Sequence, residues 1–209
     1  VAGAVGEVAD PLISKVSERI AGLRVGDGTD PDSDMGPLIT RDALDRVSGF
    51  VAGAAGEGAR LVVDGREVAV PGEGFFIGPS LVDRVTPGMR VYDEEIFGPV
   101  LSVVRVASYD EAVALINANR YANGTAVFTR DGKTARQFEY DIEVGMVGIN
   151  VPIPVPIGAF SFGGWKDSLF GDTHMYGSEA FNFYTRRKVV TSRWPEPTES
   201  QVDLGFPTH

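Results

Sequence analysis

Two adjacent carboxylates open the stretch of this sequence with the clearest chemical potential. Glu94 and Glu95 stand before an apolar pair, a Gly-Pro turn and the apolar run at residues 100–104. A turn that leads into a strand can hold a polar side chain at the edge of a cleft. The two carboxylates could form an acid and base pair, but neighbouring residues on an extended segment point to opposite faces. We therefore do not expect them to share one site, and an acidic loop before a buried strand is the plainer alternative.

Other combinations of chemically active residues are weak. The sequence has no Gly-x-Gly-x-x-Gly after a strand and no Gly-Lys-Ser/Thr phosphate loop. Asp172 and His174 could join a serine in a triad, but nothing in the sequence sets their geometry. The four aspartates within residues 27–34 suggest a calcium loop, yet the required Gly at its sixth position and Glu at its twelfth are missing. These patterns assign no catalytic residue and no metal site.

The composition limits the classes of partner. With 19 Lys and Arg against 29 Asp and Glu, the formal charge of the 209-residue chain is −10. This balance argues for a soluble protein and against nucleic-acid binding, which depends on basic contacts. The sequence contains no cysteine and only two histidines. Disulfides and thiolate metal sites are therefore excluded, and a histidine-based metal centre is not expected.

The sequence gives no sign of membrane targeting. It has no run of 18 apolar residues, so no membrane span is predicted. Its first residues, Val-Ala-Gly-Ala-Val-Gly-Glu, lack a Met and a basic region and are not interpreted as a signal peptide. We expect a cytoplasmic protein whose sequence begins inside a longer one.

Periodic apolar residues predict two helices in the first half of the chain. One covers about residues 7–23, with Pro11 in its first turns, and the other begins after Thr40, which can cap it. Residues 26–34 are dense in turn formers and indicate an exposed loop. The strands predicted in this half are residues 61–63, 68–70, 75–77 and 80–85, the first two as a hairpin.

The second half alternates strands and helices. Ser108 and Glu111 have the spacing of a capping box, in which Ser108 accepts from the Glu111 amide and the Glu111 side chain reaches back. Asp131 is expected to cap another helix. Strands separated by helices of this length favour right-handed crossovers and a parallel sheet, so the predicted fold class is α/β. The strands predicted here are residues 100–106, 125–129 and 145–150.

The last third of the chain has a different pattern. Three alternating prolines within residues 151–156 predict a stiff extended segment that leaves the sheet. Glycines within residues 160–166 predict a loop where backbones approach closely. Residues 181–194 are rich in aromatic and β-branched types and predict a long terminal strand. The residues from 195 on are expected to form a loose tail.

Several motifs of the sequence resemble the NAD(P)-dependent aldehyde dehydrogenase superfamily. Glu-Glu-Ile-Phe-Gly-Pro-Val at residues 94–100 resembles its signature, and four further motifs follow the order of the family, at residues 35–39, 121–129, 145–150 and 162–166. Within the family, the chain is most similar to the CoA-acylating branch, the methylmalonate-semialdehyde dehydrogenases. That closer similarity is carried by residues 119–129, 150–156, 171–173 and 183–185.

The resemblance implies a reaction. In that family a cysteine thiolate attacks the aldehyde, a hydride passes to NAD, and CoA resolves the thioacyl enzyme, with loss of CO2 from a carboxylated semialdehyde. A thiolate suits this role because it is nucleophilic near neutral pH and leaves a thioester readily. This sequence departs from the family because it has no cysteine. The resemblance therefore implies that the chain is the C-terminal part of such an enzyme, with the thiol and most of the NAD-binding domain upstream.

The resemblance also assigns roles to residues of this chain. Glu95 matches the carboxylate that accepts hydrogen bonds from the nicotinamide-ribose hydroxyls. Phe97 matches an aromatic residue that packs near the nicotinamide, with plain core packing as the alternative. The arginines that would hold a substrate carboxylate are not identifiable. The aldehyde entrance would be lined by Ile153, Pro154, Val155 and Phe162.

The same resemblance implies an assembly. In aldehyde dehydrogenases the matching C-terminal strand joins a sheet of a neighbouring subunit, so residues 186–193 predict a homo-oligomer, a dimer or a tetramer. Basic residues 186–188 would discourage indiscriminate pairing of that strand. The alternative is a strand that closes the sheet of its own chain. The expected division is a catalytic-domain part at residues 1–158, a return segment and oligomerisation strand at 159–194, and a tail at 195–209.

Three functions stay open on the sequence alone. The first is the C-terminal part of a CoA-acylating semialdehyde dehydrogenase that uses NAD and CoA on a small aldehyde. The second is part of a hydrolytic aldehyde dehydrogenase, which would be recognised by an upstream general-base glutamate. The third is a non-catalytic module that uses the same fold for subunit association.

Overall fold

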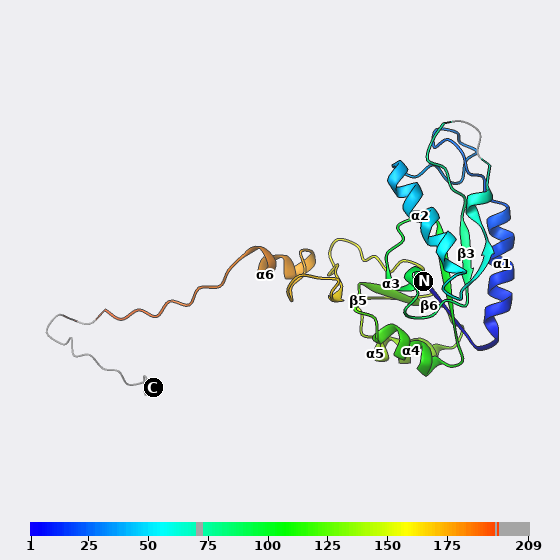
Figure 1. The fold of residues 1–209 in the computed structure, drawn as a ribbon. Coiled ribbons are helices and arrows are strands. Elements are labelled where there is room, and N and C mark those ends of the chain that lie inside the picture. Colours follow the sequence, from blue (N-terminus) through cyan, green and yellow to red (C-terminus); the bar gives the residue numbers. More distant parts are fainter. Residues whose placement is uncertain (70–72, 195, 197–209) are drawn as a thin grey trace. The chain divides into compact units, whose positions relative to one another are not determined.

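The computed structural model describes residues 1–69, 73–194 and 196 (Figure 1). The described chain forms two compact units. The first contains residues 1–119 and 136–143, and the second contains residues 120–135 and the chain from 144 on. Helix α5 (Gly132–Asp141) passes from the second unit into the first. The division at residues 158 and 194 concerns roles in a complete enzyme and stays a prediction.

The first unit is built on a four-stranded sheet in the order β1-β4-β3-β2. Strand β4 (Val100–Val106) lies between β1 (Ala2–Val5) and β3 (Ser80–Asp83) and runs parallel to both. The edge strand β2 (Arg60–Val63) is antiparallel to β3. The unit is therefore α/β with a mixed, mostly parallel sheet, as the sequence predicts.

Helices cover both faces of this sheet because its central strands are buried on both sides. Helix α1 (Ala9–Ala21) packs on the face that carries Leu81 and Val103, whereas Val82 and Val104 point to the face of α2 (Arg41–Ala54). Successive strand residues alternate between faces, so the apolar pairs Leu81–Val82 of β3 and Val103–Val104 of β4 supply one side chain to each face. Figure 1 shows α1 and α2 on opposite sides of the sheet. Short helix α3 (Arg90–Asp93) and helix α4 (Tyr109–Asn117) share the α2 face through Val91, Ala112 and Leu115.

Local hydrogen bonds begin the helices where the sequence predicts. Thr40 Oγ1 accepts from the Ala43 amide at the start of α2, and Ser108 Oγ accepts from the Glu111 amide at the start of α4. The Glu111 carboxylate reaches back one residue further than expected and accepts from the Ala107 amide at 2.7 Å. Asp131 accepts from the amides of residues 133 and 134 and caps α5. Each cap satisfies amides that the first helical turn leaves unpaired.

The predicted hairpin in the first unit is wrong. Residues 68 and 69 form no strand, and residue 70 lies outside the described part of the chain. The turn is instead a short 3₁₀ helix, η2 (Gly65–Glu67), because Asp64 Oδ1 accepts from the Arg66 amide. The partner of β2 is β3, and residues 75–77 are not a strand. A further 3₁₀ turn, η1 (Gly6–Val8), stands before α1, and strand β1 was not expected from its Ala/Gly composition.

The second unit contains two small strand pairs. Strand β6 (Gly124–Val127) is parallel to β7 (Met146–Ile149), and β5 (Tyr121–Ala122) is antiparallel to β8 (Trp165–Lys166). The predicted close approach is confirmed at Gly145. A Cβ on that glycine would lie 2.1 Å from the Gly163 carbonyl oxygen.

The predicted terminal strand at residues 181–194 is wrong for this single chain. Residues of its first part belong to α6 (Ala180–Tyr184), which follows the 3₁₀ turn η3 (Gly177–Glu179). The Phe183 and Tyr184 rings meet edge to face at 4.9 Å within this helix. Residues 185–194 form no helix or strand, because a strand needs the hydrogen-bonding groups of a neighbour. The predicted tail from 195 lies outside the described residues, apart from residue 196. Among the described helices, none has both the length and the apolar character needed to cross a bilayer.

Candidate functional site

The two carboxylates at the start of the signature have different surroundings. Helix α3 ends at Asp93, and Glu94 turns back to pair with Arg90, whose Nε donates to Oε1 at 2.8 Å. This hydrogen bond lowers the pKa of the Glu94 carboxyl. Glu95 is exposed, and no hydrogen bond or ion pair joins its carboxylate to a described residue. The Glu94 carboxylate is thus already paired with Arg90, whereas the Glu95 carboxylate is available to a ligand.

Phe97 projects from the same turn into solvent. Its side chain is 79% exposed, and its φ of 48° lies in the left-handed region. Residues other than glycine rarely adopt that conformation, and bulky ones do so under constraint. Core packing, the alternative weighed for Phe97, is therefore not its role within this chain. Backbone strain and an exposed aromatic ring together mark the turn as a candidate binding surface.

Helix α2 holds this turn in place. Arg46 Nη1 donates to the Glu95 carbonyl oxygen at 3.2 Å. Gly98 lies directly against Val47, since a Cβ on Gly98 would come within 2.6 Å of Val47 Cγ2. Sequence reasoning did not identify Arg46, because no local pattern links residues 49 positions apart. The Arg90–Glu94 pair could have been found, because oppositely charged residues four apart on a helix commonly pair.

The predicted entrance residues lie in the second unit. Ile153 is 70% exposed and Val155 is 58% exposed, while Pro154 between them is half-buried. Phe162 is half-buried and packs edge to face on Tyr176, with ring centroids 5.9 Å apart. The structure thus places Ile153, Pro154 and Val155 on one loop. Glu95 and Phe97 belong to the other compact unit.

The triad considered for Asp172 and His174 is not assembled. His174 Nδ1 is hydrogen-bonded to the Ser161 hydroxyl. No hydrogen bond joins Asp172 to the His174 ring in the described structure. A triad needs the carboxylate on one ring nitrogen and the nucleophile on the other. Within the described residues, no group of three potential metal ligands comes together either.

Comparison with known proteins decides the family. The family model described as "Aldehyde dehydrogenase family" matches residues 4–190. This chain belongs to the aldehyde dehydrogenase family. The match begins within β1 and extends through the rest of the first unit and most of the second, to residue 190.

Curated relatives narrow the similarity within the aldehyde dehydrogenases. The chain is 55% identical over 205 residues to a malonate-semialdehyde dehydrogenase of Pseudomonas aeruginosa, covering 97% of this chain and 41% of that protein. It is 47% identical over 196 residues to the mitochondrial acylating methylmalonate-semialdehyde dehydrogenase of Arabidopsis thaliana, covering 93% of this chain and 32% of the relative. The chain therefore spans less than half the length of these two relatives.

Solved aldehyde dehydrogenase structures share this fold. The methylmalonate-semialdehyde dehydrogenase of Oceanimonas doudoroffii matches with a TM-score of 0.85 and 53% identity, over 95% of this chain and 42% of its own. An aldehyde dehydrogenase of Mycobacterium tuberculosis, solved with NAD+, matches with a TM-score of 0.77 and 31% identity, over 89% of this chain and 38% of its own. The family that the motif at residues 94–100 indicated is thus confirmed, and the similarity extends over most of the chain.

Proposed function

We propose that this chain is the C-terminal part of an NAD-dependent, CoA-acylating semialdehyde dehydrogenase. The reaction takes malonate or methylmalonate semialdehyde, NAD+ and CoA to acetyl-CoA or propionyl-CoA, CO2 and NADH. The names of the relatives support the semialdehyde, and the acylating relative from Arabidopsis supports CoA over water as the acyl acceptor. The partial coverage of these relatives supports a longer complete protein.

The availability of Glu95 next to the exposed Phe97 carries the proposal. A carboxylate accepts two hydrogen bonds at once, so Glu95 suits the paired hydroxyls of a ribose. The Phe97 ring presents a flat apolar surface beside it, against which a nicotinamide ring can pack. The residues present therefore fit an NAD ribose and nicotinamide, and NAD when bound supplies the hydride acceptor.

The residues of this chain orient the reactants in this proposal. Arg46 and Val47 hold the backbone of the turn, so that the main chain carrying Glu95 is in place before a ligand arrives. Preorganisation of this kind allows hydrogen-bond energy to be used for orientation rather than for ordering the protein. The chain contains no cysteine, so the nucleophilic thiol must come from outside these 209 residues. Ile153, Pro154, Val155 and Phe162 form the apolar entrance for the aldehyde.

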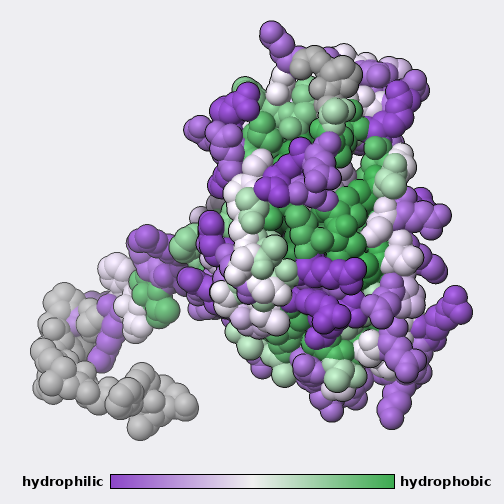
Figure 2. Space-filling view, turned by 45° about the vertical axis from the view of Figure 1, so that its right-hand side comes forward, coloured by the Kyte–Doolittle hydropathy of each residue, from purple (hydrophilic) through white to green (hydrophobic). Residues whose placement is uncertain are grey.

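Exposed apolar surface supports a larger assembly. The C-terminal segment carries Val189 at 91% exposure, Val190 at 73% and Trp194 at 93%. Figure 2 also shows hydrophobic residues gathered on one face of the chain and bordered by hydrophilic ones. Uncovered apolar surface of this kind marks an interaction surface. The proposal therefore includes a homo-oligomer, a dimer or a tetramer, in which residues 186–193 pair with a neighbouring subunit.

The complete gene product tests the proposed function directly. It is purified and incubated with NAD+, CoA and malonate semialdehyde, and the products are identified by mass spectrometry. Equal amounts of acetyl-CoA and NADH are the expected result. Free acid formed without consumption of CoA would favour the hydrolytic alternative, and no NADH would contradict the proposal.

The proposal also includes a location in the cytoplasm, because NAD and CoA are intracellular metabolites.

A further inference from the structure

Asn150 joins the ends of two parallel strands through its side chain. Its Oδ1 accepts from the Thr129 amide at 2.9 Å, and its Nδ2 donates to the Thr129 carbonyl oxygen at 3.0 Å. The Asn150 amide also donates to the Val127 carbonyl oxygen at 2.8 Å. One side chain thus extends the β6–β7 pairing by two bonds beyond the last strand residues. We call this pair of side-chain bonds to Thr129 the Asn150 clamp.

The backbone of Asn150 redirects the chain at the same point. Its φ of 57° is left-handed, a conformation that asparagine tolerates better than most residues. The chain then folds back over the strands it has just left. A Cβ on Gly148 would lie 2.5 Å from the Val151 carbonyl oxygen and 3.3 Å from Pro154 Cβ. A side chain at residue 148 would therefore clash with the returning loop.

A second glycine, Gly124, makes room for this loop on the strands. A Cβ on Gly124 would lie 3.3 Å from Pro154 Cγ. Gly124 and Gly148 belong to β6 and β7, so Pro154 rests on both strands of the pair. The central proline of the alternating motif thus has a packing role, because Pro154 is half-buried against both strands.

The alternation turns the remaining side chains outward. Ile153 is 70% exposed, Val155 58% and Ile157 73%. These three residues form an apolar ridge, and its distance from the strands is set by Pro154, which packs on Gly124 and Gly148. Because these side chains are largely exposed, the position of the ridge depends on the Asn150 clamp and on the packing of Pro154 on Gly124 and Gly148.

We propose that Asn150 is a positioning residue for substrate selection. Its clamp holds the ridge of Ile153, Val155 and Ile157 at a fixed distance, and the ridge packs against the aliphatic part of a small acidic aldehyde. A ridge in a fixed place distinguishes a methyl-bearing aldehyde from an unsubstituted one, because a single methyl group fits or leaves a gap. This inference rests on the proposed function, in which these residues line the aldehyde entrance.

Hydrogen exchange tests the clamp without any activity. The 209-residue chain is compared as wild type, Asn150→Gly and Asn150→Ala by mass spectrometry of peptides that cover residues 129 and 151–155. Loss of the bonds is expected to speed exchange of the Thr129 amide by about tenfold, because that amide loses its acceptor. Glycine is the informative variant, since it accepts a φ of 57° without strain. Wild-type exchange in Asn150→Gly would show that the side chain holds nothing and would overturn the inference.

Two further variants guard this experiment. Asn150→Asp keeps an acceptor for the Thr129 amide but loses the donor, so an intermediate rate is expected, and it serves if the other variants do not fold. Tyr140→Ala removes a side chain that is 92% exposed, and its exchange at residue 129 is expected to equal wild type. Equal acceleration in Tyr140→Ala would indicate general loosening and would contradict the inference.

Kinetics of the complete enzyme test the consequence for substrate. The quantity is the ratio of kcat/KM for methylmalonate semialdehyde to that for malonate semialdehyde. Asn150→Gly is expected to change this ratio by up to about tenfold, since one methyl group is at stake, and to leave the KM for NAD unchanged. Faster exchange with an unchanged ratio would refute the role in selection and leave the proposed function intact. A wild-type enzyme inactive on both aldehydes would refute the proposed function, whereas the exchange result would stand.

Discussion

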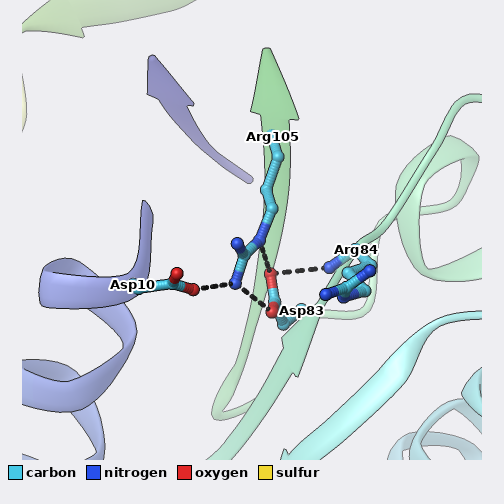
Figure 3. Close-up of polar contacts among 4 residues, drawn as sticks. All are labelled: Asp10, Asp83, Arg84 and Arg105. Atoms are coloured by element: carbon cyan, nitrogen blue, oxygen red, sulfur yellow. Dashed lines mark hydrogen bonds and ion pairs between the residues drawn. The ribbon is translucent and has the colours of Figure 1, made fainter. Parts of the chain in front are cut away.

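Arg105 holds the carboxylate of Asp83 with two parallel hydrogen bonds, from Nε to Oδ1 at 2.9 Å and from Nη2 to Oδ2 at 2.7 Å (Figure 3). Asp83 is fully buried at the end of β3, and Oδ1 also accepts from the Arg84 amide at 2.7 Å. Arg105 lies on the neighbouring strand β4 and also pairs with Asp10, whose side chain is 84% exposed. This network fixes the ends of the two strands next to each other. Strand β4 is also the one that the Glu95 turn leads into.

Removal of the buried carboxylate is expected to destabilise the chain. Asp83→Ala leaves the guanidinium of Arg105 without its inner partner, and breaking a pair with a buried member costs about 3 kcal/mol or more. Asp10→Ala breaks only the exposed end of the same network and should cost far less, since exposed pairs are weak. Urea unfolding of both variants, followed by circular dichroism, measures the two losses. Equal losses would show that the burial of Asp83 does not set its contribution.

Stability should fall in acid partly through Asp83. Burial by itself raises the pKa of this carboxyl, but the hydrogen bonds from Arg105 and the Arg84 amide, with their charges, leave the pKa below its usual value. Stability from a lowered pKa is present above the unfolded value of about 3.9 and is lost as pH falls through the folded value. The difference in unfolding free energy between wild type and Asp83→Ala should therefore shrink below about pH 4. A difference that stays constant from neutral pH to acid would contradict this.

Glu95→Gln in the complete enzyme should impair hydride transfer more than it weakens overall NAD binding. The amide keeps one acceptor but loses charge-assisted contacts to the ribose, each worth about 1.5–3 kcal/mol. We expect single-turnover NADH formation to slow by about tenfold or more. Glu94→Gln is the matched control, because that carboxylate is occupied by Arg90, and its rate should stay within about twofold of wild type. Equal effects of both substitutions would assign Glu95 a structural role only.

Deletion of residues 186–209 from the complete enzyme should disrupt the oligomer. In the single chain, residues 185–194 form no strand, and their apolar side chains are exposed. In the proposed assembly, their backbone N–H and C=O groups form hydrogen bonds with a sheet of a neighbouring subunit. Light scattering measures the mass, and deletion of residues 195–209 alone serves as the control. If the longer deletion keeps the wild-type mass, the segment is not the assembly element.

The 209-residue chain alone should not oxidise aldehydes. It contains no cysteine, so no thiol is present to form a thiohemiacetal. The purified chain is assayed with NAD+, CoA and malonate semialdehyde for NADH formation. Turnover above background, in a preparation shown to contain no full-length enzyme, would refute this prediction.

The sequence by itself determined the features that depend on near neighbours. The caps at Thr40, Ser108 and Asp131 were predicted because each involves amides two or three residues away. Strand β4 was predicted with its observed bounds, because five of its seven residues are apolar and a largely apolar run of this length indicates burial on both faces. The family and the absence of a thiol could also be recognised from the sequence. The family depends on the order of residue types, and the absence of a thiol depends on composition alone.

Only the tertiary structure decided the features that depend on distant partners. Strand β1 has little apolar character of its own and exists because its backbone pairs with β4, about 100 residues away. Strand β2 pairs with β3 rather than with the nearer residues 68 and 69, because Asp64 caps a 3₁₀ turn directly after β2. The hold of Arg46 on Glu95, the strained φ of Phe97 and the clamp of Asn150 have no local signal either. A contact between residues far apart in sequence is set by the packing of whole elements, which no short window of residues contains.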